Sequence, residues 1–124
     1  MSKTILIVDD SAINRRILSN ILAADYSVIE AEDGRGALSA LHQSHRIISA
    51  ILLDIQMPVM DGYQAARAIR ALNRADARTV PILALTANAF ATDIGKAHSA
   101  GMNGHVAKPI EMDRLMETMQ RWIR

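Results

Sequence analysis

Polar residues that could bind a cation or a phosphoryl group follow four short apolar runs of the sequence: Asp9 with Asp10, Asp54, Thr86 and Lys108. Three carboxylates held close together repel one another and raise the pKa of one of them unless a cation joins them. Oxygen ligands in a chain without cysteine favour Mg²⁺ or the similar Mn²⁺. A carboxylate can also attack phosphorus and form an aspartyl phosphate. These residue types therefore indicate a metal-assisted site that accepts a phosphoryl group.

The stretch ILLDIQMPVMDG, residues 51–62, contains the carboxylate that most needs a partner. Asp54 stands among apolar residues of high strand propensity, which predict a strand buried on both faces. An ionised carboxylate at the end of such a strand is costly unless other groups compensate its charge. We therefore expect the ends of other strands to supply those groups.

The positioning elements alternate along the chain. Predicted strands cover residues 5–8, 26–31, the run that ends at Asp54, 82–85 and 104–107. Between them, apolar residues at helical spacing predict helices. The first is capped by Ser11 and carries the stripe Ile13, Ile17, Ile21 and Ala24; the second follows Asp33-Gly34; the third follows Gly62; the fourth spans about 89–100 and stops at Gly101; the last carries Met112, Leu115, Met119 and Trp122.

Strict alternation of strand and helix with short loops predicts an α/β fold. The expected architecture is a (βα)5 doubly wound parallel sheet of flavodoxin-like order 2-1-3-4-5, with helices on both faces. Strands one and three are then neighbours at the switch point, where ligands bind outside the carboxyl ends. This order would bring Asp9, Asp10 and Asp54 together.

Size and charge set limits on function. The 124 residues predict one domain spanning 1–124, and 14 Lys plus Arg against 13 Asp plus Glu give a net charge of +1. That balance offers no electrostatic basis for binding nucleic acid or an anionic membrane. No run of membrane length and no signal peptide are found, so a cytoplasmic protein is expected.

The set DD at 9–10, LLDIQMPVMDG around Asp54, LTANAF at 85–90 and AKPI at 107–110 resembles the response-regulator receiver domain over essentially the whole chain. The resemblance implies that Asp54 is the phosphoacceptor. It implies that Asp9, Asp10 and the backbone carbonyl of Gln56 bind the metal with Asp54, Asp10 being the more direct ligand of the pair.

The same resemblance assigns the remaining positions. Thr86 and the N–H of Ala87 would contact the phosphoryl group, and Lys108 would be its counter-charge. The bond before Pro109 is typically cis in this family. His105 stands where an aromatic Tyr or Phe is usual, so we expect Thr86 and His105 to form the conformational switch.

The implied function is that of a two-component or phosphorelay switch rather than a conventional enzyme. The phosphoryl group would come from phosphohistidine on a histidine kinase or a histidine phosphotransfer domain, and the switch would control a partner or an attached output domain. A phosphorylation-dependent homodimer through the fourth helix, the last strand and the last helix is a further expectation. The motifs are closest in style to receivers of hybrid kinases and multidomain regulators.

Three alternatives remain open. The chain could be the receiver portion of a longer hybrid histidine kinase. It could be an Mg-dependent aspartyl-phosphate phosphatase, which would need a second acid–base carboxylate and usually a cap. A flavin carrier of the same fold would need a Ser/Thr/Gly-rich phosphate loop where this sequence has DDSAIN.

Other polar and apolar side chains have simpler interpretations. We expect solvated positions for His42, His45, Arg67, Arg70 and Arg74. The stripe on the last helix is interpreted as core, with Met116 or Trp122 at an interface as the alternative. The candidates for docking a histidine phosphodonor are Ile13, Asn14, Ile17 and Ile110, and core packing is at least as favourable for Ile17.

Overall fold

A computed structural model describes residues 3–43, 48–57, 60–72, 74–87 and 91–123. Its centre is a parallel sheet of five strands in the order β2-β1-β3-β4-β5, as predicted. The strands are β1 (Thr4–Val8), β2 (Ser27–Ala31), β3 (Ile48–Asp54), β4 (Ile82–Thr86) and β5 (Gly104–Ala107). Every residue of β1, β3 and β4 is buried except one residue of β3. These three are the central strands of the sheet, as their apolar sequences predict.

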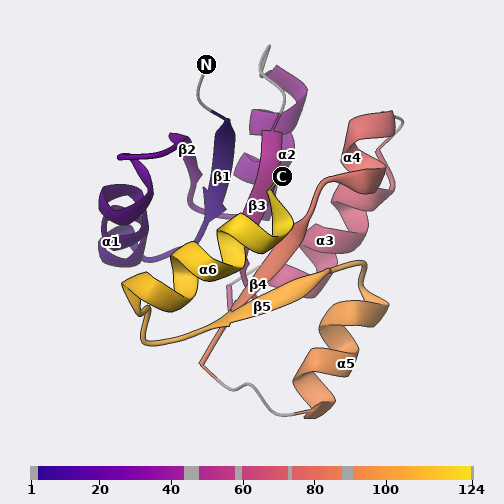
Figure 1. Ribbon diagram of the computed structural model, residues 1–124. Coiled ribbons are helices and arrows are strands. Elements are labelled where there is room, and N and C mark those ends of the chain that lie inside the picture. The colour runs from indigo at the N-terminus through magenta and orange to yellow at the C-terminus, as the bar shows by residue number, and fades with distance from the viewer. Residues whose placement is uncertain (1–2, 44–47, 58–59, 73, 88–90, 124) are drawn as a thin grey trace.

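Helices cover both faces of the sheet (Figure 1). They are α1 (Ala12–Leu22), α2 (Gly34–Gln43), α3 (Gly62–Arg70), α4 (Ala75–Thr79), α5 (Ala91–Ser99) and α6 (Met112–Trp122). One core lies under α1 and α6 and includes Leu18, Leu22, Leu115 and Met119. The other lies under the remaining helices and includes Leu41, Ile69, Ala77 and Ala97. The predicted two-sided covering is therefore confirmed.

The expectation of five helices is wrong in one place. The short helix α4 lies between α3 and β4, where the sequence has too few apolar residues for a periodic pattern. An ion pair and a buried side chain help to hold it. The guanidinium of Arg74 donates to both carboxylate oxygens of Asp76 at 3.1 and 2.7 Å, and Ala77 is buried in the core. The fourth predicted helix corresponds to α5, whose predicted start at residue 89 lies outside the described residues.

Two apolar stripes are also corrected. On α1 the buried residues are Leu18 and Leu22, whereas Ile13 is 73% exposed and Ile17 is 44% exposed. On α6 Leu115 and Met119 are buried as predicted, but Met112 is 55% exposed because it opens the helix beyond the edge of the core. Ile13 and Ile17 are thus apolar side chains that the fold leaves at the surface.

Arg70 and Arg74 are not merely solvated, contrary to the prediction, while Arg67 is exposed. Arg70 donates to the carbonyl oxygen of Gly101 at 2.8 and 3.0 Å, to that of Ala77 at 3.0 Å and to Asn103 Oδ1 at 2.8 Å. It joins α3 to α4 and to the turn after α5, and its burial lowers the pKa of its guanidinium. Gly101 has a positive φ of +100°, a conformation that favours glycine, and the predicted end of the helix at this residue is confirmed.

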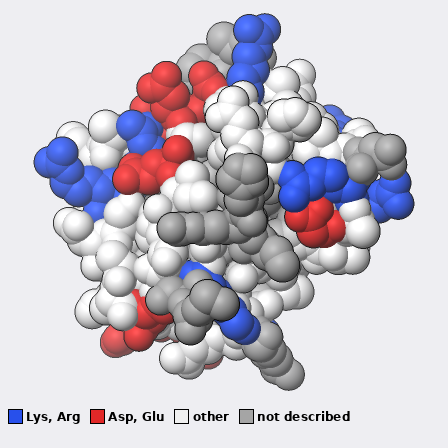
Figure 2. All heavy atoms as spheres, turned by 90° about the horizontal axis from the view of Figure 1, so that it is seen from above, with Lys and Arg blue, Asp and Glu red and all other residues white. Residues whose placement is uncertain are grey.

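His42 is exposed, as expected, and His45 lies outside the described residues. Figure 2 shows the face at the top of Figure 1, where acidic and basic side chains gather in small separate groups among uncharged ones. This mixture agrees with the net charge of +1. Among the described residues, the helices are too short or too polar to cross a membrane.

Candidate functional site

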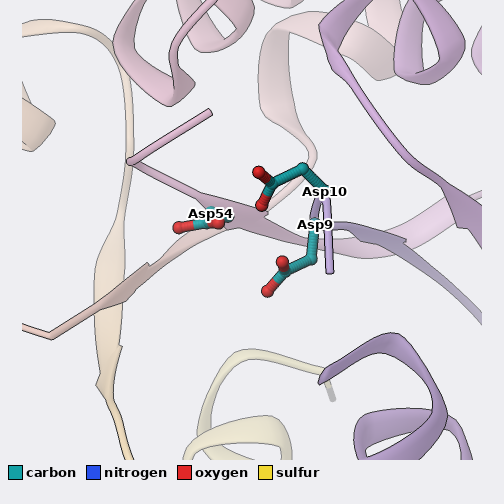
Figure 3. A group of neighbouring side chains, drawn as sticks. All are labelled: Asp9, Asp10 and Asp54. Carbon is teal, nitrogen blue, oxygen red and sulfur yellow. The ribbon is translucent and has the colours of Figure 1, made fainter. Parts of the chain in front are cut away.

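Three carboxylates gather at the carboxyl ends of β1 and β3. One oxygen each from Asp9, Asp10 and Asp54 lies within 4.8 Å of the other two. Figure 3 shows Asp9 and Asp10 on the segment after β1 and Asp54 at the end of β3, with the three carboxyl groups around one common space. The parallel pairing of β1 with β3 produces this arrangement, because it brings Val8 opposite Leu53. The predicted convergence at the switch point is confirmed.

Asp9 is completely buried, and three of its four polar groups are occupied. Its N–H donates to the carbonyl of Ala31 at 3.1 Å, its carbonyl accepts from Arg15 Nη1 at 2.6 Å, and its Oδ1 accepts from the N–H of Ser11 at 2.9 Å. Ser11 also caps α1, since its side chain accepts from the N–H of Asn14 at 3.3 Å. Within the described residues Oδ2 of Asp9 accepts no hydrogen bond.

Asp54 is 3% exposed. Burial raises the pKa of Asp54 from 3.8 to about 6; the hydrogen bond from the N–H of Gln56 lowers this pKa, the charge of Asp9 raises it, and Lys108 lowers it. Desolvation is the largest of these effects. Lys108 therefore does not fully compensate the negative charge of Asp54 beside that of Asp9, and a further cation would do so. Asp10, by contrast, is exposed.

Lys108 directly follows β5, which is separated from β3 by β4, and its side chain reaches across to the carboxylates. Its Nζ lies 3.2 Å from Asp54 Oδ1 and 3.6 Å from Asp9 Oδ2. The backbone of Lys108 is fixed by a hydrogen bond of 2.7 Å from its N–H to the carbonyl of Thr86. The Lys108–Pro109 bond is cis, as the resemblance predicts.

Gly62 allows the next helix to begin directly against the end of β3. A Cβ atom on Gly62 would lie 2.4 Å from the carbonyl oxygen of Asp54 and 2.6 Å from the Cα of Ile55. The N–H of Gly62 donates to the carbonyl of Ile55 at 3.0 Å. Asp61 and Gln64 form a reciprocal capping box at the start of α3. The loop that follows Asp54 is therefore anchored at its far end.

The remaining predicted residues lie around this centre. Thr86 is buried at the end of β4, next to β3, and Ala87 follows it at the surface. Gln56 is exposed beside Asp54. His105 is exposed on β5, and it lines a pocket of about 440 Å³ that is also lined by Lys108 and by residues along α6 from Arg114 to Arg121. The structure thus brings Asp9, Asp10, Asp54 and Lys108 together and leaves His105 facing outward.

Sequence reasoning missed Arg15. Besides its bond to the carbonyl of Asp9, its Nε lies 3.3 Å from Glu30 Oε1 on β2. The spacing from Asp9 to Arg15 places the arginine in the first turn of α1, facing back toward the strand end, and this spacing is the feature that could have indicated it.

The donor set fits a hard divalent cation. All three side chains supply carboxylate oxygen, the ligand type that Mg²⁺ prefers. Oδ2 of Asp9 is buried, close to the other acids, and accepts no hydrogen bond among the described residues, so a ligand at this place would satisfy it.

Comparison with known proteins gives one consistent result. The family profile described as "Response regulator receiver domain" matches residues 5–120. The sensor histidine kinase RcsC of Escherichia coli K12 is 38% identical over 116 residues, which cover 93% of this chain but only 12% of the kinase. The chain therefore spans about an eighth of the length of that relative.

Two solved structures are similar over nearly the whole chain. The receiver domain of a sensor histidine kinase from Pseudomonas aeruginosa PAO1, with magnesium coordinated in its active site cleft, is 39% identical with a TM-score of 0.87, covering 99% of this chain and 98% of that one. The receiver domain of the Saccharomyces cerevisiae response regulator Ssk1, in co-crystal with the histidine phosphotransfer protein Ypd1, is 29% identical with a TM-score of 0.86, covering 98% and 89%.

Proposed function

This chain belongs to the response regulator receiver domain family of two-component and phosphorelay systems, and from that premise we propose that Asp54 is its phosphoacceptor. The observation that carries the proposal is the position of Lys108 Nζ, 3.2 Å from Asp54 Oδ1, beside a cluster of three carboxylates. Asp54 is the member of the cluster that lies at the end of a central strand, flanked by the other two acids and by the lysine.

In the proposed reaction a carboxylate oxygen of Asp54 attacks phosphorus as the bond to the donor imidazole nitrogen breaks. The imidazole leaves with the electron pair of the P–N bond and takes up a proton. Lys108 compensates the charge of the phosphoryl oxygens, and the N–H of Gln56 holds the carboxylate in place. Catalysis consists mainly of positioning and charge compensation.

A divalent cation, Mg²⁺ or Mn²⁺, would be held by Asp9, Asp10, Asp54 and the backbone carbonyl of Gln56. It would supply the positive charge that lets the phosphoryl oxygens approach three carboxylates. Support comes from the fit of the donor set and from the magnesium in the Pseudomonas aeruginosa receiver domain.

Thr86 and Ala87 are the proposed contacts for the bound phosphoryl group, because they follow the strand next to Asp54. His105 is the proposed reporter. It lies on the strand that precedes Lys108 and is exposed in this state, so an inward movement would change the surface formed by β5 and α6. Phosphorylation would then shift an equilibrium between two arrangements.

The proposed donor is a phosphohistidine on a histidine kinase or a histidine phosphotransfer domain. The exposed Ile13 and Ile17 on α1 are the proposed docking residues, with Asn14 and the half-buried Ile110.

A phosphorylation-dependent homodimer through α5, β5 and α6 belongs to the same proposal. We further propose a cytoplasmic location and a single domain over residues 1–124. We also propose that the chain is the receiver portion of a longer hybrid kinase or regulator, since the match covers only 12% of the relative RcsC.

Intact-mass measurement after incubation with acetyl phosphate and Mg²⁺ tests the proposal. The expected result is an increase of about 80 Da, one phosphoryl group, which disappears in Asp54→Asn and in the presence of EDTA. Asp33→Asn, which changes an acid outside the cluster, is the matched control and keeps the adduct. An adduct that survives in Asp54→Asn would refute the assignment, and rapid turnover of p-nitrophenyl phosphate would favour the phosphatase alternative.

A further inference from the structure

Arg15 is the residue through which the first acid of the cluster is fixed to the rest of the fold. Its Nη1 donates to the carbonyl oxygen of Asp9 at 2.6 Å, and its Nε lies 3.3 Å from Glu30 Oε1. The side chain of Arg15 is 16% exposed, so the bond to Asp9 is largely shielded from water. One guanidinium therefore connects α1, the end of β1 and strand β2.

Among the described residues the hydrogen bonds of Asp9 leave its Oδ2 atom, which lies 3.6 Å from Lys108 Nζ, for a ligand. Ala31 accepts from its N–H, Arg15 donates to its carbonyl and the N–H of Ser11 donates to its Oδ1. The peptide on both sides of Cα is thus held, and the position of Oδ2 follows from it. Because Asp10 is joined to the carbonyl group that Arg15 holds, the same bond also orients the second acid of the cluster.

We propose that Arg15, itself oriented by Glu30, is a positioning residue for the divalent cation at the acidic cluster. This inference rests on the proposed function, since it assumes that Asp9, Asp10 and Asp54 bind Mg²⁺. Arg15 does not contact the metal; it holds the backbone from which two of the ligands project. Partners of this kind typically contribute about 10-fold to 100-fold in metal affinity.

The charge of Arg15 and its positioning role have opposite effects on the affinity for Mg²⁺. A measurement of that affinity therefore distinguishes the two roles. A guanidinium near a cation site repels the cation, so removal of the charge alone would strengthen Mg²⁺ binding. Loss of positioning would weaken it, because the two carboxylates would no longer be held at one place. Weaker binding after removal of Arg15 therefore reports positioning.

The test is calorimetric titration of the whole chain with Mg²⁺ alone, together with urea unfolding in EDTA and in saturating Mg²⁺. Arg15→Gln is expected to bind Mg²⁺ about tenfold more weakly than the wild type. Arg16→Gln is the matched control, because Arg16 is the exposed neighbour on the same helix and its change removes the same charge. It is expected to keep the wild-type affinity.

Four results would decide the matter. A Mg²⁺ affinity of Arg15→Gln that equals or exceeds that of the wild type overturns the inference. The inference is also overturned if Arg15→Gln is less stable than the wild type in EDTA but Mg²⁺ raises its free energy of unfolding by the same amount, since the effect of the substitution is then purely structural. If Arg15→Gln does not fold, Arg15→Lys decides: weaker Mg²⁺ binding supports positioning, and wild-type binding overturns it. Absence of Mg²⁺ binding by the wild type would instead refute the proposed function.

Discussion

The Nζ of Lys108 lies 3.2 Å from Oδ1 of Asp54, although the two residues follow strands that are not neighbours in the sheet. The strand between them, β4, sets the distance through the bond from the N–H of Lys108 to the carbonyl of Thr86. The ammonium group of Lys108 therefore compensates the charge of the Asp54 carboxylate. If Asp54 binds a divalent cation and accepts a phosphoryl group as proposed, Lys108 and that cation would act on the same charge, so they should compete in binding and cooperate in the reaction.

Replacing Lys108 should separate these two effects. In Lys108→Met, Mg²⁺ should bind more tightly, because a competing cation is removed from Asp54 and Asp9. The rate of modification by acetyl phosphate should nevertheless fall about 100-fold, since the charge that faces the phosphoryl group is lost. Mg²⁺ titration and intact-mass kinetics measure the two quantities. Lys96→Met on α5 is the matched control, and equal losses of both quantities in Lys108→Met would contradict the model of competition.

The raised pKa of Asp54 predicts a pH-dependent stability of the metal-free protein. The pKa is 3.8 in the unfolded chain and about 6 in the folded one, so the folded state holds this proton more tightly. The stabilisation is therefore complete below about pH 4 and is lost as the pH rises through about 6. The loss should be about 2 kcal/mol in the free energy of unfolding.

Urea unfolding in EDTA, from about pH 4 to pH 7, measures this dependence. The difference in free energy between wild type and Asp54→Asn should change over this range, because the amide does not titrate. Parallel pH profiles for the two proteins would show that the carboxyl group of Asp54 has an ordinary pKa.

Gly62→Ala should destabilise the protein by about 2 kcal/mol, the usual scale of overpacking. The added Cβ would lie 2.4 Å from the carbonyl oxygen of Asp54, so the start of α3 or the end of β3 must shift. Gly95→Ala is a matched control on α5, where a Cβ meets no atom within 4 Å. It should stabilise the protein by up to about 1 kcal/mol through higher helix propensity. Denaturant unfolding measures both, and similar effects at the two positions would refute the steric explanation.

Arg70→Gln should lower the free energy of unfolding by about 2 kcal/mol, because the carbonyl of Gly101 loses two donors and that of Ala77 loses one. Arg67→Gln, on the exposed side of the same helix, should change stability by less than about 0.5 kcal/mol. The comparison of their urea midpoints is the measurement. Equal midpoints would show that the connection from α3 to the turn after α5 contributes nothing to stability.

Ile13→Ser should weaken phosphotransfer from a histidine phosphotransfer domain while leaving acetyl phosphate modification unchanged. Ile13 is 73% exposed, so the substitution removes apolar contact area without opening a cavity. The expected change is about tenfold in the concentration of donor protein needed for half-maximal rate. Unchanged transfer would exclude Ile13 as a docking residue, and a parallel loss with acetyl phosphate would point to damage of the site.

The sequence alone predicted the five strands and the cluster at their ends, and it favoured the strand order 2-1-3-4-5 that the structure has. The wholly apolar runs 5–8 and 82–85 favour the centre of a parallel sheet, where a strand is buried on both faces. Once these runs are central, the acids that end two of them must meet at the switch point. The sequence also indicated which side chains meet there, and the structure brings Asp9, Asp10, Asp54 and Lys108 together.

Only the tertiary structure decided which apolar face of α1 is buried and which arginines have partners. Ile13 and Leu18 are both apolar, and the helical period alone does not tell which of two overlapping stripes meets the sheet. The spacing from Asp9 indicates only that Arg15 lies near the strand end, and no spacing indicates Arg70. The groups that accept their hydrogen bonds include the backbone carbonyls of Asp9 and Gly101. A carbonyl group is common to every residue, so its need for a donor leaves no trace in the sequence and becomes visible only when the chain is folded.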